Sequence, residues 1–238
     1  MNLQKNAGIM NITGDTGITS RGTVPLRCSC NNPITNTINL QVIQVMKIVG
    51  VGCGPGMLTE MAIGVISGAD LIYGSKRAIE TVKSHIHEGC TVREIGDYRG
   101  LGSLPDHAVI LSTGDPMLAG LGYLPGEVIP GISSLQLAAA RLHLSLAHVS
   151  VVLAHGRDHT HATEKTLLEL SRGKVVFLIP DPKFSVPDLA KALMPGYPAI
   201  TMVVLENLGY PDERILMGTP DNPPRPASDL FSLVIGDL

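Results

Sequence analysis

Two short segments, residues 112–116 (STGDP) and 130–134 (PGISS), contain the residue types best suited to hold a small ligand. Each follows an apolar run typical of a buried strand, so both are expected at one edge of one sheet, where open α/β sheets bind ligands. Glycine lets a ligand approach the backbone, and the Asp115 carboxylate can accept hydrogen bonds. Ser133 and Ser134 stand where a helix begins with unpaired N–H groups. Asp115 could instead cap a helix, or do both.

A histidine-rich segment, residues 155–161 (HGRDHTH), is a second candidate. Its Arg157 suits bidentate binding of a carboxylate on a ligand, and a structural ion pair between domains is the alternative. His155 and the two histidines after it could bind a metal ion, but they fall in an expected loop without a thiolate partner. We therefore expect solvated histidines and no metal site.

A glycine-rich loop at residues 51–56 (VGCGPG) separates the first expected strand from the first expected helix, where backbone N–H groups can face a ligand. Alone, it resembles the first motif of Rossmann-type S-adenosylmethionine methyltransferases. That fold holds the ribose of its cofactor with an acid at the end of the second strand. Here the second strand ends in residues 71–75 (LIYGS), and Gly50 stands where that class usually has another acid. The missing acids argue against a Rossmann-type enzyme, and a turn required for packing is the other alternative.

These candidates lie in a chain whose strands and helices alternate from residue 46 onward in the βαβ manner. The pattern predicts an α/β fold with two α/β domains, residues 46–146 and 147–238, the second with a mixed sheet. The expected strands are 47–51, 70–73, 91–94, 108–111, 127–129, 149–153, 174–179, 199–205, 214–217 and 231–235. The expected helices are 57–67, 74–85, 133–142, 162–171 and 186–194.

Residues 1–45 differ from the rest, because Asn, Thr, Gly, Ser and Pro dominate and no periodicity persists. We interpret them as an N-terminal extension that is either disordered or the product of a mis-assigned start, with Met46 as the true first residue. In both cases we expect the extension to have no role in function.

The composition is that of a soluble globular protein and excludes several classes of function. Hydrophobic residues make up 44% of the chain and charged residues 16%, and the net charge of −3 gives no attraction to nucleic acid or to an anionic membrane. Aromatic residues at 3% leave little for base stacking. No apolar run approaches the roughly 20 residues of a membrane span. Without a secretion signal or a CxxC pair, we expect reduced thiols in a cytoplasmic protein.

The motifs taken together, in their order along the chain, resemble the tetrapyrrole methylase family, the class III S-adenosylmethionine-dependent methyltransferases. The resemblance covers nearly everything from Met46 onward. Its motifs are residues 54–56 (GPG), 114–116 (GDP), 130–134 (PGISS), 175–179 (VVFLI), 206–209 (ENLG) with Glu213, 218–219 (GT) and 230–236.

This resemblance implies two α/β domains that form a cleft, a folded S-adenosylmethionine between them, and a homodimer. A carboxylate would accept from the ammonium of the methionine end, and backbone amides would suit the adenine edge. Carried over position by position, the cofactor would contact Pro55, Gly114, Asp115, Leu118, Ala119, Ser133, Ser134, Leu178, Ile179 and Leu205. The substrate would contact Lys76, His155 and Arg157. Lys76 with Arg77 is otherwise an exposed helix start.

Three further segments, residues 74–78 (GSKRA), 134–138 (SLQLA) and 155–157 (HGR), look like the family members that methylate carbon 5 of cobalt-precorrin-7, or of a precorrin-6Y-type intermediate, in cobalamin biosynthesis. The substrate would then be a tetrapyrrole, and a separate protein would methylate carbon 15. A methyl sulfonium is already activated and the accepting ring carbon is electron-rich, so we expect no catalytic nucleophile and no dedicated base.

Other functions remain as alternatives. A class III enzyme could act on another corrin carbon, on a protein side chain or on ribosomal RNA, although the negative net charge disfavours RNA. A protein that binds S-adenosylmethionine without transferring its methyl group is the non-enzymatic alternative.

Overall fold

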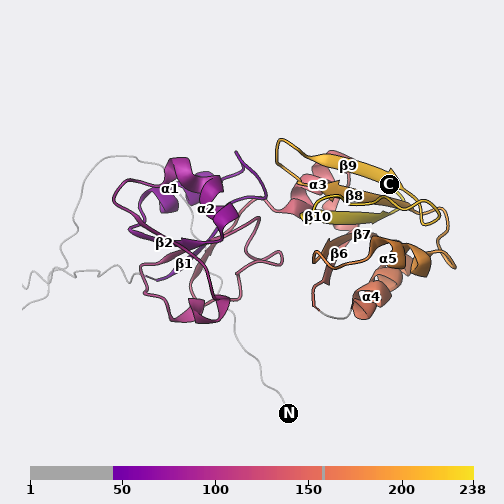
Figure 1. Ribbon diagram of the computed structural model, residues 1–238, viewed down its shortest axis with the longest axis horizontal. Helices are drawn as coiled ribbons and strands as arrows, with labels where there is room; N and C mark the ends of the chain where they lie inside the picture. Colours follow the sequence, from indigo (N-terminus) through magenta and orange to yellow (C-terminus); the bar gives the residue numbers. More distant parts are fainter. Residues whose placement is uncertain (1–44, 157–158) are drawn as a thin grey trace, which may run out of the picture. The chain divides into compact units, whose positions relative to one another are not determined.

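The computed structural model describes residues 45–156 and 159–238 (Figure 1). These residues belong to one compact unit of the chain. The interpretation of the N-terminal extension and the prediction for Arg157 therefore concern residues outside the described ranges. None of the described helices is long and apolar enough to cross a membrane.

Five parallel strands form the first sheet, in the order β3-β2-β4-β1-β5. The inner strand β4 is buried along its whole length, as expected for a parallel strand that is covered on both faces. The strands are β1 (Lys47–Gly50), β2 (Leu71–Gly74), β3 (Thr91–Glu94), β4 (Val109–Ser112) and β5 (Glu127–Ile129). The helices between them are α1 (Glu60–Ser67) and α2 (Lys76–Val82), with the short 3₁₀ helices η1 (Lys83–His85) and η2 (Tyr98–Ser103).

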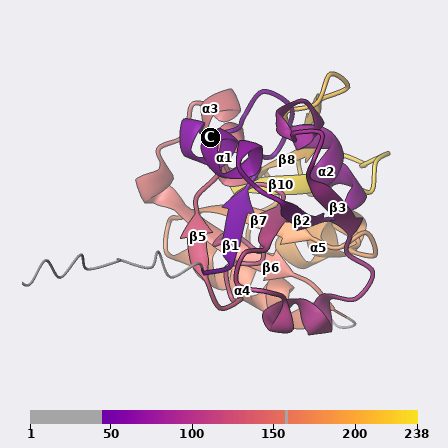
Figure 2. The same ribbon diagram turned by 90° about the vertical axis from the view of Figure 1, so that its left-hand side faces the viewer.

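The register of this sheet brings the candidate loops together. Gly50 at the end of β1 pairs with Ser112 at the end of β4, and β5 lies in register on the other side of β1 (Figure 2). Beyond the strands, the Gly52 N–H donates to the Gly114 carbonyl (3.2 Å) and the Gly114 N–H to the Gly52 carbonyl (2.7 Å). The expectation that these loops share one sheet edge is confirmed.

The second sheet is mixed, as the sequence predicts, with the order β6-β7-β10-β8-β9. Only β6 and β7 are parallel; β10 lies between β7 and β8 and is antiparallel to both. The strands are β6 (Val149–Ala154), β7 (Val175–Pro180), β8 (Thr201–Glu206), β9 (Arg214–Gly218) and β10 (Phe231–Gly236). The helices are α3 (Ser134–Leu142), α4 (Thr160–Ser171) and α5 (Val186–Leu193), with the 3₁₀ helix η3 (Leu146–His148).

Opposite faces of the second sheet bury different helices, because side chains alternate along a strand. Leu178 of β7 packs in one core with residues of α4 and α5. Phe177 of β7 packs in another core with Leu137 and Ala138 of α3. Thus α3, which precedes the domain boundary expected near residue 146, packs against the second sheet. That boundary stays a prediction.

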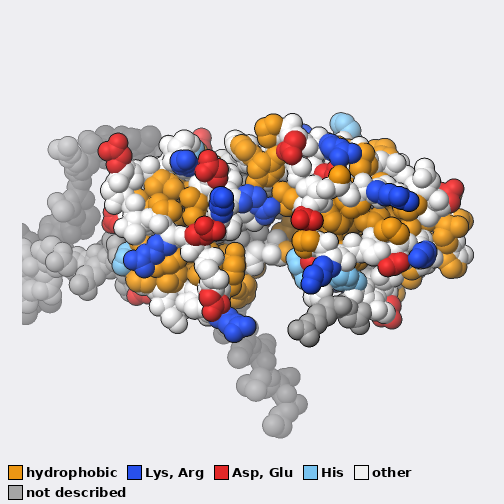
Figure 3. All heavy atoms as spheres, in the orientation of Figure 1, with side chains coloured by type: hydrophobic (Ala, Val, Ile, Leu, Met, Phe, Trp, Pro, Cys, Tyr) orange, Lys and Arg blue, Asp and Glu red, His pale blue; other side chains and the backbone are white. Residues whose placement is uncertain are grey.

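Side-chain caps set the starts of the helices that carry candidate residues. The Thr59 hydroxyl accepts from the Ala62 N–H, so α1 begins at Glu60 and not at residue 57, where its apolar pattern begins. Ser75 caps α2 in the same way, so Lys76 becomes the first helical residue. On the face shown in Figure 3, acidic and basic side chains are interspersed.

Candidate functional site

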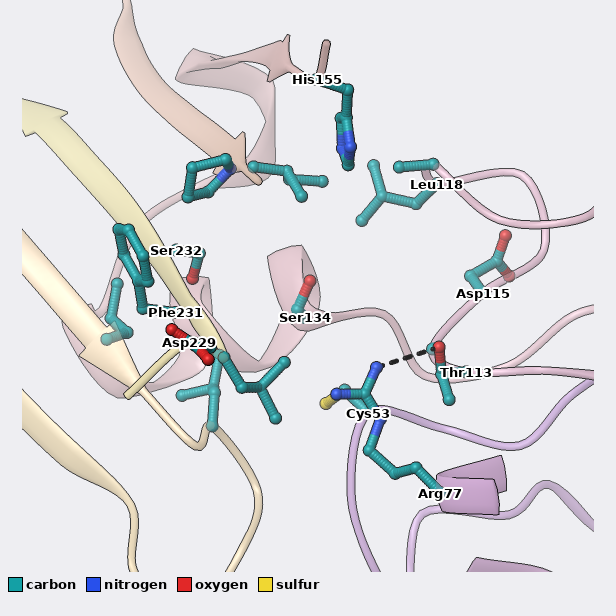
Figure 4. Close-up of a pocket in the computed structure, with 17 residues that line it drawn as sticks. Cys53, Arg77, Thr113, Asp115, Leu118, Ser134, His155, Asp229, Phe231 and Ser232 are labelled. Carbon is teal, nitrogen blue, oxygen red and sulfur yellow. Dashed lines mark hydrogen bonds between the residues drawn. The ribbon is translucent and has the colours of Figure 1, made fainter. Parts of the chain in front are cut away.

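A cavity of about 260 Å³ lies among the loops that leave both sheets (Figure 4). The loop after β4 and the first turn of α3 contribute Thr113, Gly114, Asp115, Leu118, Ala119 and Ser134. The ends of β6, β7 and β8 and the start of β10 contribute His155, Ile179, Pro180, Leu205, Leu208 and residues 229–232. Figure 4 shows Thr113 and Asp115 on one side of the cavity, with Asp229, Phe231 and Ser232 on the other.

Asp115 joins the two loops that the sequence singles out. Its Oδ1 accepts from the Met117 N–H (2.8 Å) and its Oδ2 from the Gly131 N–H (3.0 Å). No helix begins at Asp115, so the capping role is that of a turn. A carboxylate offers about four acceptor sites. Two of them are used by the protein, and the remaining capacity can face a cation in the cavity.

The loop after β4 has an unusual backbone at the two cavity-lining positions Gly114 (φ 69°) and Ala119 (φ 57°). A methyl group added at Gly114 would meet only Ser133 Cα, at 4.0 Å, so the glycine leaves space on the cavity side. Ala119 holds a left-handed conformation that costs a residue with a side chain about 1–2 kcal/mol. Such positions cluster at ligand sites, where the surrounding structure holds them in place.

The two serines of α3 have different positions. Ser133 is buried and caps the helix: its Oγ accepts from the Gln136 N–H (3.2 Å), while Gln136 Oε1 accepts from the Ser133 N–H (2.8 Å). Ser134 lines the cavity. Ser133 thus fixes the start of α3, whose first residue, Ser134, lines the cavity. A contact between Ser133 and the cofactor stays a prediction.

The apolar wall comes from the second sheet and from Leu118. Ile179 and Leu205 line the cavity, whereas the neighbouring Leu178 is fully buried in the core beneath α4 and α5. This difference follows from the alternation of side chains along β7. The buried position of Leu178 gives no support to a contact between its side chain and the cofactor. The side chain of Ile179, by contrast, faces the cavity.

The remaining predicted residues divide between two hollows. His155 lines the cavity. Pro55 and Lys76 line a second, adjoining hollow. His159 is bound within the protein, since its Nε2 lies 3.1 Å from Asp181 Oδ2. The described residues include no group of three or more His, Cys, Asp or Glu that could hold a metal ion.

Asp181 fixes the loop that carries His155. Besides His159, its carboxylate accepts from the Gly156 N–H (3.0 Å) and the Lys183 N–H (2.8 Å). The hydrogen bond from His159, with those from the backbone, lowers the pKa of Asp181 to about 2. Asp181 is therefore ionised throughout the neutral range and holds this loop in place beside the cavity.

Glu206 has the same role at the other end of the apolar wall. Its side chain is only 1% exposed, and Oε1 accepts from the N–H groups of Ala227 and Ser228. Its Oε2 lies 3.1 Å from Arg214 Nη1, with which it forms an ion pair. These contacts fix the segment immediately before β10, and with it Asp229 in the cavity.

Sequence reasoning did not assign several lining residues to the site. Thr113, Cys53 and Arg77 lie inside quoted motifs, so their neighbours gave a signal that could have found them. Residues 230–232 lie inside the motif at 230–236, but no local pattern connects them or Asp229 with the cavity, because they reach it only through the antiparallel pairing of β10 between β7 and β8. The sequence patterns also give no role to Pro180 and Leu208, which line the cavity.

Comparisons with known proteins identify the family of the chain. The sequence model of the Tetrapyrrole (Corrin/Porphyrin) Methylases matches residues 47–223. A probable cobalt-precorrin-7 C(5)-methyltransferase of Methanocaldococcus jannaschii is 35% identical over 186 residues, covering 69% of this chain and 85% of that protein. The decarboxylating precorrin-6Y C(5,15)-methyltransferase of a Sinorhizobium species is 28% identical over 190 residues, covering 71% of this chain and 44% of that protein.

A solved structure shares the fold as well. The crystal structure of the cobalamin biosynthesis precorrin-6Y methylase of Archaeoglobus fulgidus is 30% identical, with a TM-score of 0.64, covering 81% of this chain and 98% of that one. The family model covers the first sheet, the second sheet except β10, and most of the residues that line the cavity. The chain belongs to the tetrapyrrole (corrin/porphyrin) methylase family.

Proposed function

We propose that the protein transfers the methyl group of S-adenosylmethionine to carbon 5 of cobalt-precorrin-7, or of a precorrin-6Y-type intermediate, in cobalamin biosynthesis. The observation that carries the proposal is the 35% identity to the Methanocaldococcus jannaschii protein of that name, over 85% of its length. The Archaeoglobus fulgidus structure, named a precorrin-6Y methylase, supports the same chemistry.

The lining of the cavity fits S-adenosylmethionine, the methyl donor of the family. The partly exposed Asp115 carboxylate can accept from the cofactor's ammonium, and the space at Gly114 lets the methionine end approach the backbone. Ile179 and Leu205 provide the apolar side that an adenine ring requires. Leu118, Ala119 and Ser134 complete the proposed cofactor set that lines the cavity.

Methyl transfer requires little covalent chemistry from these residues. S-adenosylmethionine supplies an activated methyl group, so the protein must align donor and acceptor and exclude water. Cys53 is the nucleophilic side chain at the cavity, but burial raises the pKa of its thiol, which donates to the Met57 sulfur (3.5 Å). A neutral thiol is a poor nucleophile. We therefore assign no covalent catalyst and no dedicated base.

The substrate contacts and the assembly are part of the same proposal. We propose that the substrate contacts His155, which lines the cavity, Lys76, which lines the adjoining hollow, and Arg157, which follows His155 in the chain. We further propose a cytoplasmic homodimer. The relatives named for carbon 5 alone suggest that a separate protein methylates carbon 15.

One experiment tests the reaction directly. The protein is incubated with cobalt-precorrin-7 and S-adenosylmethionine labelled with ¹³C in the methyl group, and the labelled carbon of the product is located by NMR. A single new methyl on carbon 5 is expected. A label on another corrin carbon would identify a different enzyme of the family. Cofactor binding without transfer to cobalt-precorrin-7 would indicate a non-catalytic protein, and either result overturns the proposal.

A further inference from the structure

Two loops that are distant in the chain touch each other through their glycines. They are the glycine-rich loop after β1, residues 51–56, and the loop between β8 and β9, residues 207–213. A Cβ atom added at Gly54 would overlap the carbonyl group of Gly209, so the two backbones are in direct contact. Gly209 itself has a φ of 86°, which favours glycine. The contact joins a loop of the first sheet to a loop of the second.

The same two loops form part of the wall of the cofactor cavity. Cys53 precedes Gly54 in the chain, Leu208 precedes Gly209, and both line the cavity. Leu208 belongs to the core on the α3 side of the second sheet, and Cys53 packs against that core. A displacement of either glycine would therefore move a residue that lines the cavity.

Glu213 holds Gly209 in this position although it does not itself line the cavity. Its Oε2 accepts from the Gly209 N–H (2.8 Å). Arg141 of α3 donates to both oxygens of the carboxylate, from Nε to Oε1 (2.6 Å) and from Nη2 to Oε2 (3.4 Å). The hydrogen bond from Arg141 keeps the pKa of Glu213 below its usual range, so the carboxylate is ionised at neutral pH. Glu213 thus connects the loop to α3, whose first residue, Ser134, lines the cavity.

The beginning of this loop is fixed by a different side chain. Asn207 has a left-handed backbone with a φ of 48°. Its Nδ2 donates to Asp212 Oδ2 (2.7 Å), and its Oδ1 accepts from the Ser228 hydroxyl (2.8 Å). These contacts hold the backbone where the chain leaves β8, whereas the carboxylate of Glu213 holds the part that meets Gly54.

We propose that Glu213 is a positioning residue for the cofactor: by binding Gly209 and Arg141, it keeps residues 207–213 against Gly54 and the cavity wall in place. The inference rests on the part of the proposed function that concerns S-adenosylmethionine, and it is independent of the carbon that is methylated. If the cofactor binds only when this wall is in place, a looser loop lowers the fraction of protein competent to bind. The apparent affinity for the cofactor then falls by the same factor.

The first test measures the affinity for S-adenosylhomocysteine by calorimetry in the wild type, Glu213→Ala, Glu213→Gln and the matched control Glu169→Ala. The side chain of Glu169 has a similar exposure (14% against 17%) and pairs with Arg172 at 2.7 Å, but it does not line the cavity. Glu213→Ala should weaken binding by about fivefold, the effect of losing one hydrogen bond. Glu213→Gln should lose less, because an amide oxygen can still accept from the Gly209 N–H. Glu169→Ala should lose stability and keep the affinity of the wild type.

The second test measures the opening of the wall itself, through the rate at which iodoacetamide alkylates Cys53. Mass spectrometry of the digested protein follows Cys53 separately from Cys90, which lies outside the cavity and serves as an internal reference. Alkylation of Cys53 should be severalfold faster in Glu213→Ala than in the wild type and unchanged in Glu169→Ala. The rate at Cys90 should be the same in all variants.

Three results would overturn the inference. They are equal affinity for S-adenosylhomocysteine in the wild type and Glu213→Ala, an equal loss of affinity in Glu213→Ala and Glu169→Ala, and an unchanged rate of alkylation at Cys53 in Glu213→Ala. A wild type that binds the cofactor and methylates another carbon would overturn the proposed function and leave the inference standing. A wild type that binds no S-adenosylhomocysteine would overturn both.

Discussion

The two sheets hold their cavity loops with carboxylates, but they place these carboxylates differently. In the first sheet Asp115 both ties two loops together and lines the cavity. In the second sheet Asp181 and Glu206 tie the loops, whereas their neighbours Pro180 and Leu205 line the cavity. Holding the loops and lining the cavity thus fall to one residue in the first sheet and are divided between adjacent residues in the second. Substitutions should therefore separate stability from cofactor affinity in the second sheet and not in the first.

The largest effect on stability is expected at Glu206. Glu206→Ala removes the acceptor of two backbone N–H groups and leaves a hole in a buried position, so the free energy of unfolding should fall by about 2–3 kcal/mol. Arg214 is half exposed, and water can solvate it when its partner is lost. Urea unfolding measures the change, with the exposed Glu164→Ala as control. A loss below about 0.5 kcal/mol, the usual range of surface substitutions, would show that Glu206 does not hold this segment.

Asp115→Ala should combine a loss of affinity with a loss of stability. Removing a charged acceptor from the cofactor's ammonium should weaken S-adenosylmethionine binding by about tenfold or more, measured by calorimetry. The unfolding free energy should fall by about 1–2 kcal/mol, because the Met117 and Gly131 N–H groups lose their partner. Asp106→Ala, at an exposed position outside the cavity, is the matched control. Unchanged cofactor affinity would contradict the assignment of Asp115.

Ala119 offers a smaller effect of opposite sign. Ala119→Gly relieves a left-handed backbone and should raise the free energy of unfolding by about 1 kcal/mol. The same exchange at Ala140, an exposed position of α3, should lower it by about 1 kcal/mol, because glycine destabilises a regular helix. Thermal unfolding of the two variants compares them directly. If both variants lose stability to the same extent, the backbone at Ala119 is not left-handed in solution.

The last expected effect is a dependence of stability on pH, and it concerns Asp181. Its pKa is lowered to about 2 in the folded protein, so its contribution to stability is complete above its ordinary pKa of about 4. That contribution should decline as the pH falls from about 4 through about 2. Asp181→Asn should therefore show a weaker loss of stability across this interval, measured by urea unfolding at each pH. Identical slopes for wild type and variant would remove Asp181 from the acid response.

The sequence could predict the parts of the site that depend on neighbours in the chain. The motifs at 112–116 and 130–134 follow β4 and β5, the parallel strands on either side of β1, and parallel order alone brings their loops to one edge. The sequence predicts a cofactor contact for both Leu178 and Ile179, and alternation along β7 directs the side chain of Leu178 into the core and that of Ile179 to the cavity. The alternation of side chains along a strand shows which residues share a face of the sheet, but not which face meets the cavity. Both faces of this sheet are covered, so the sequence pattern alone does not decide between them.

The contribution of β10 could not be predicted from local pattern. Leu233 pairs with Leu178 on one side and with Val204 on the other, and these contacts join segments distant in the chain. Asp229 and its neighbours line the cavity only because of this pairing. The buried Glu206 is a comparable case, since a single acid in an apolar strand gives no indication of the loop that it will bind.

The central position of β10 has a consequence for the order in which the protein can form during synthesis. The first sheet uses only residues up to 129, so all its strands have been made before the chain reaches α3. By contrast, α3 carries a complete capping box but must wait for its packing partners, because β7, β8 and β10 are synthesised later. Until Phe231–Gly236 has left the ribosome, the second sheet lacks its middle strand and the apolar face of α3 has no complete partner. Nascent chains that pause in this interval present that face to chaperones.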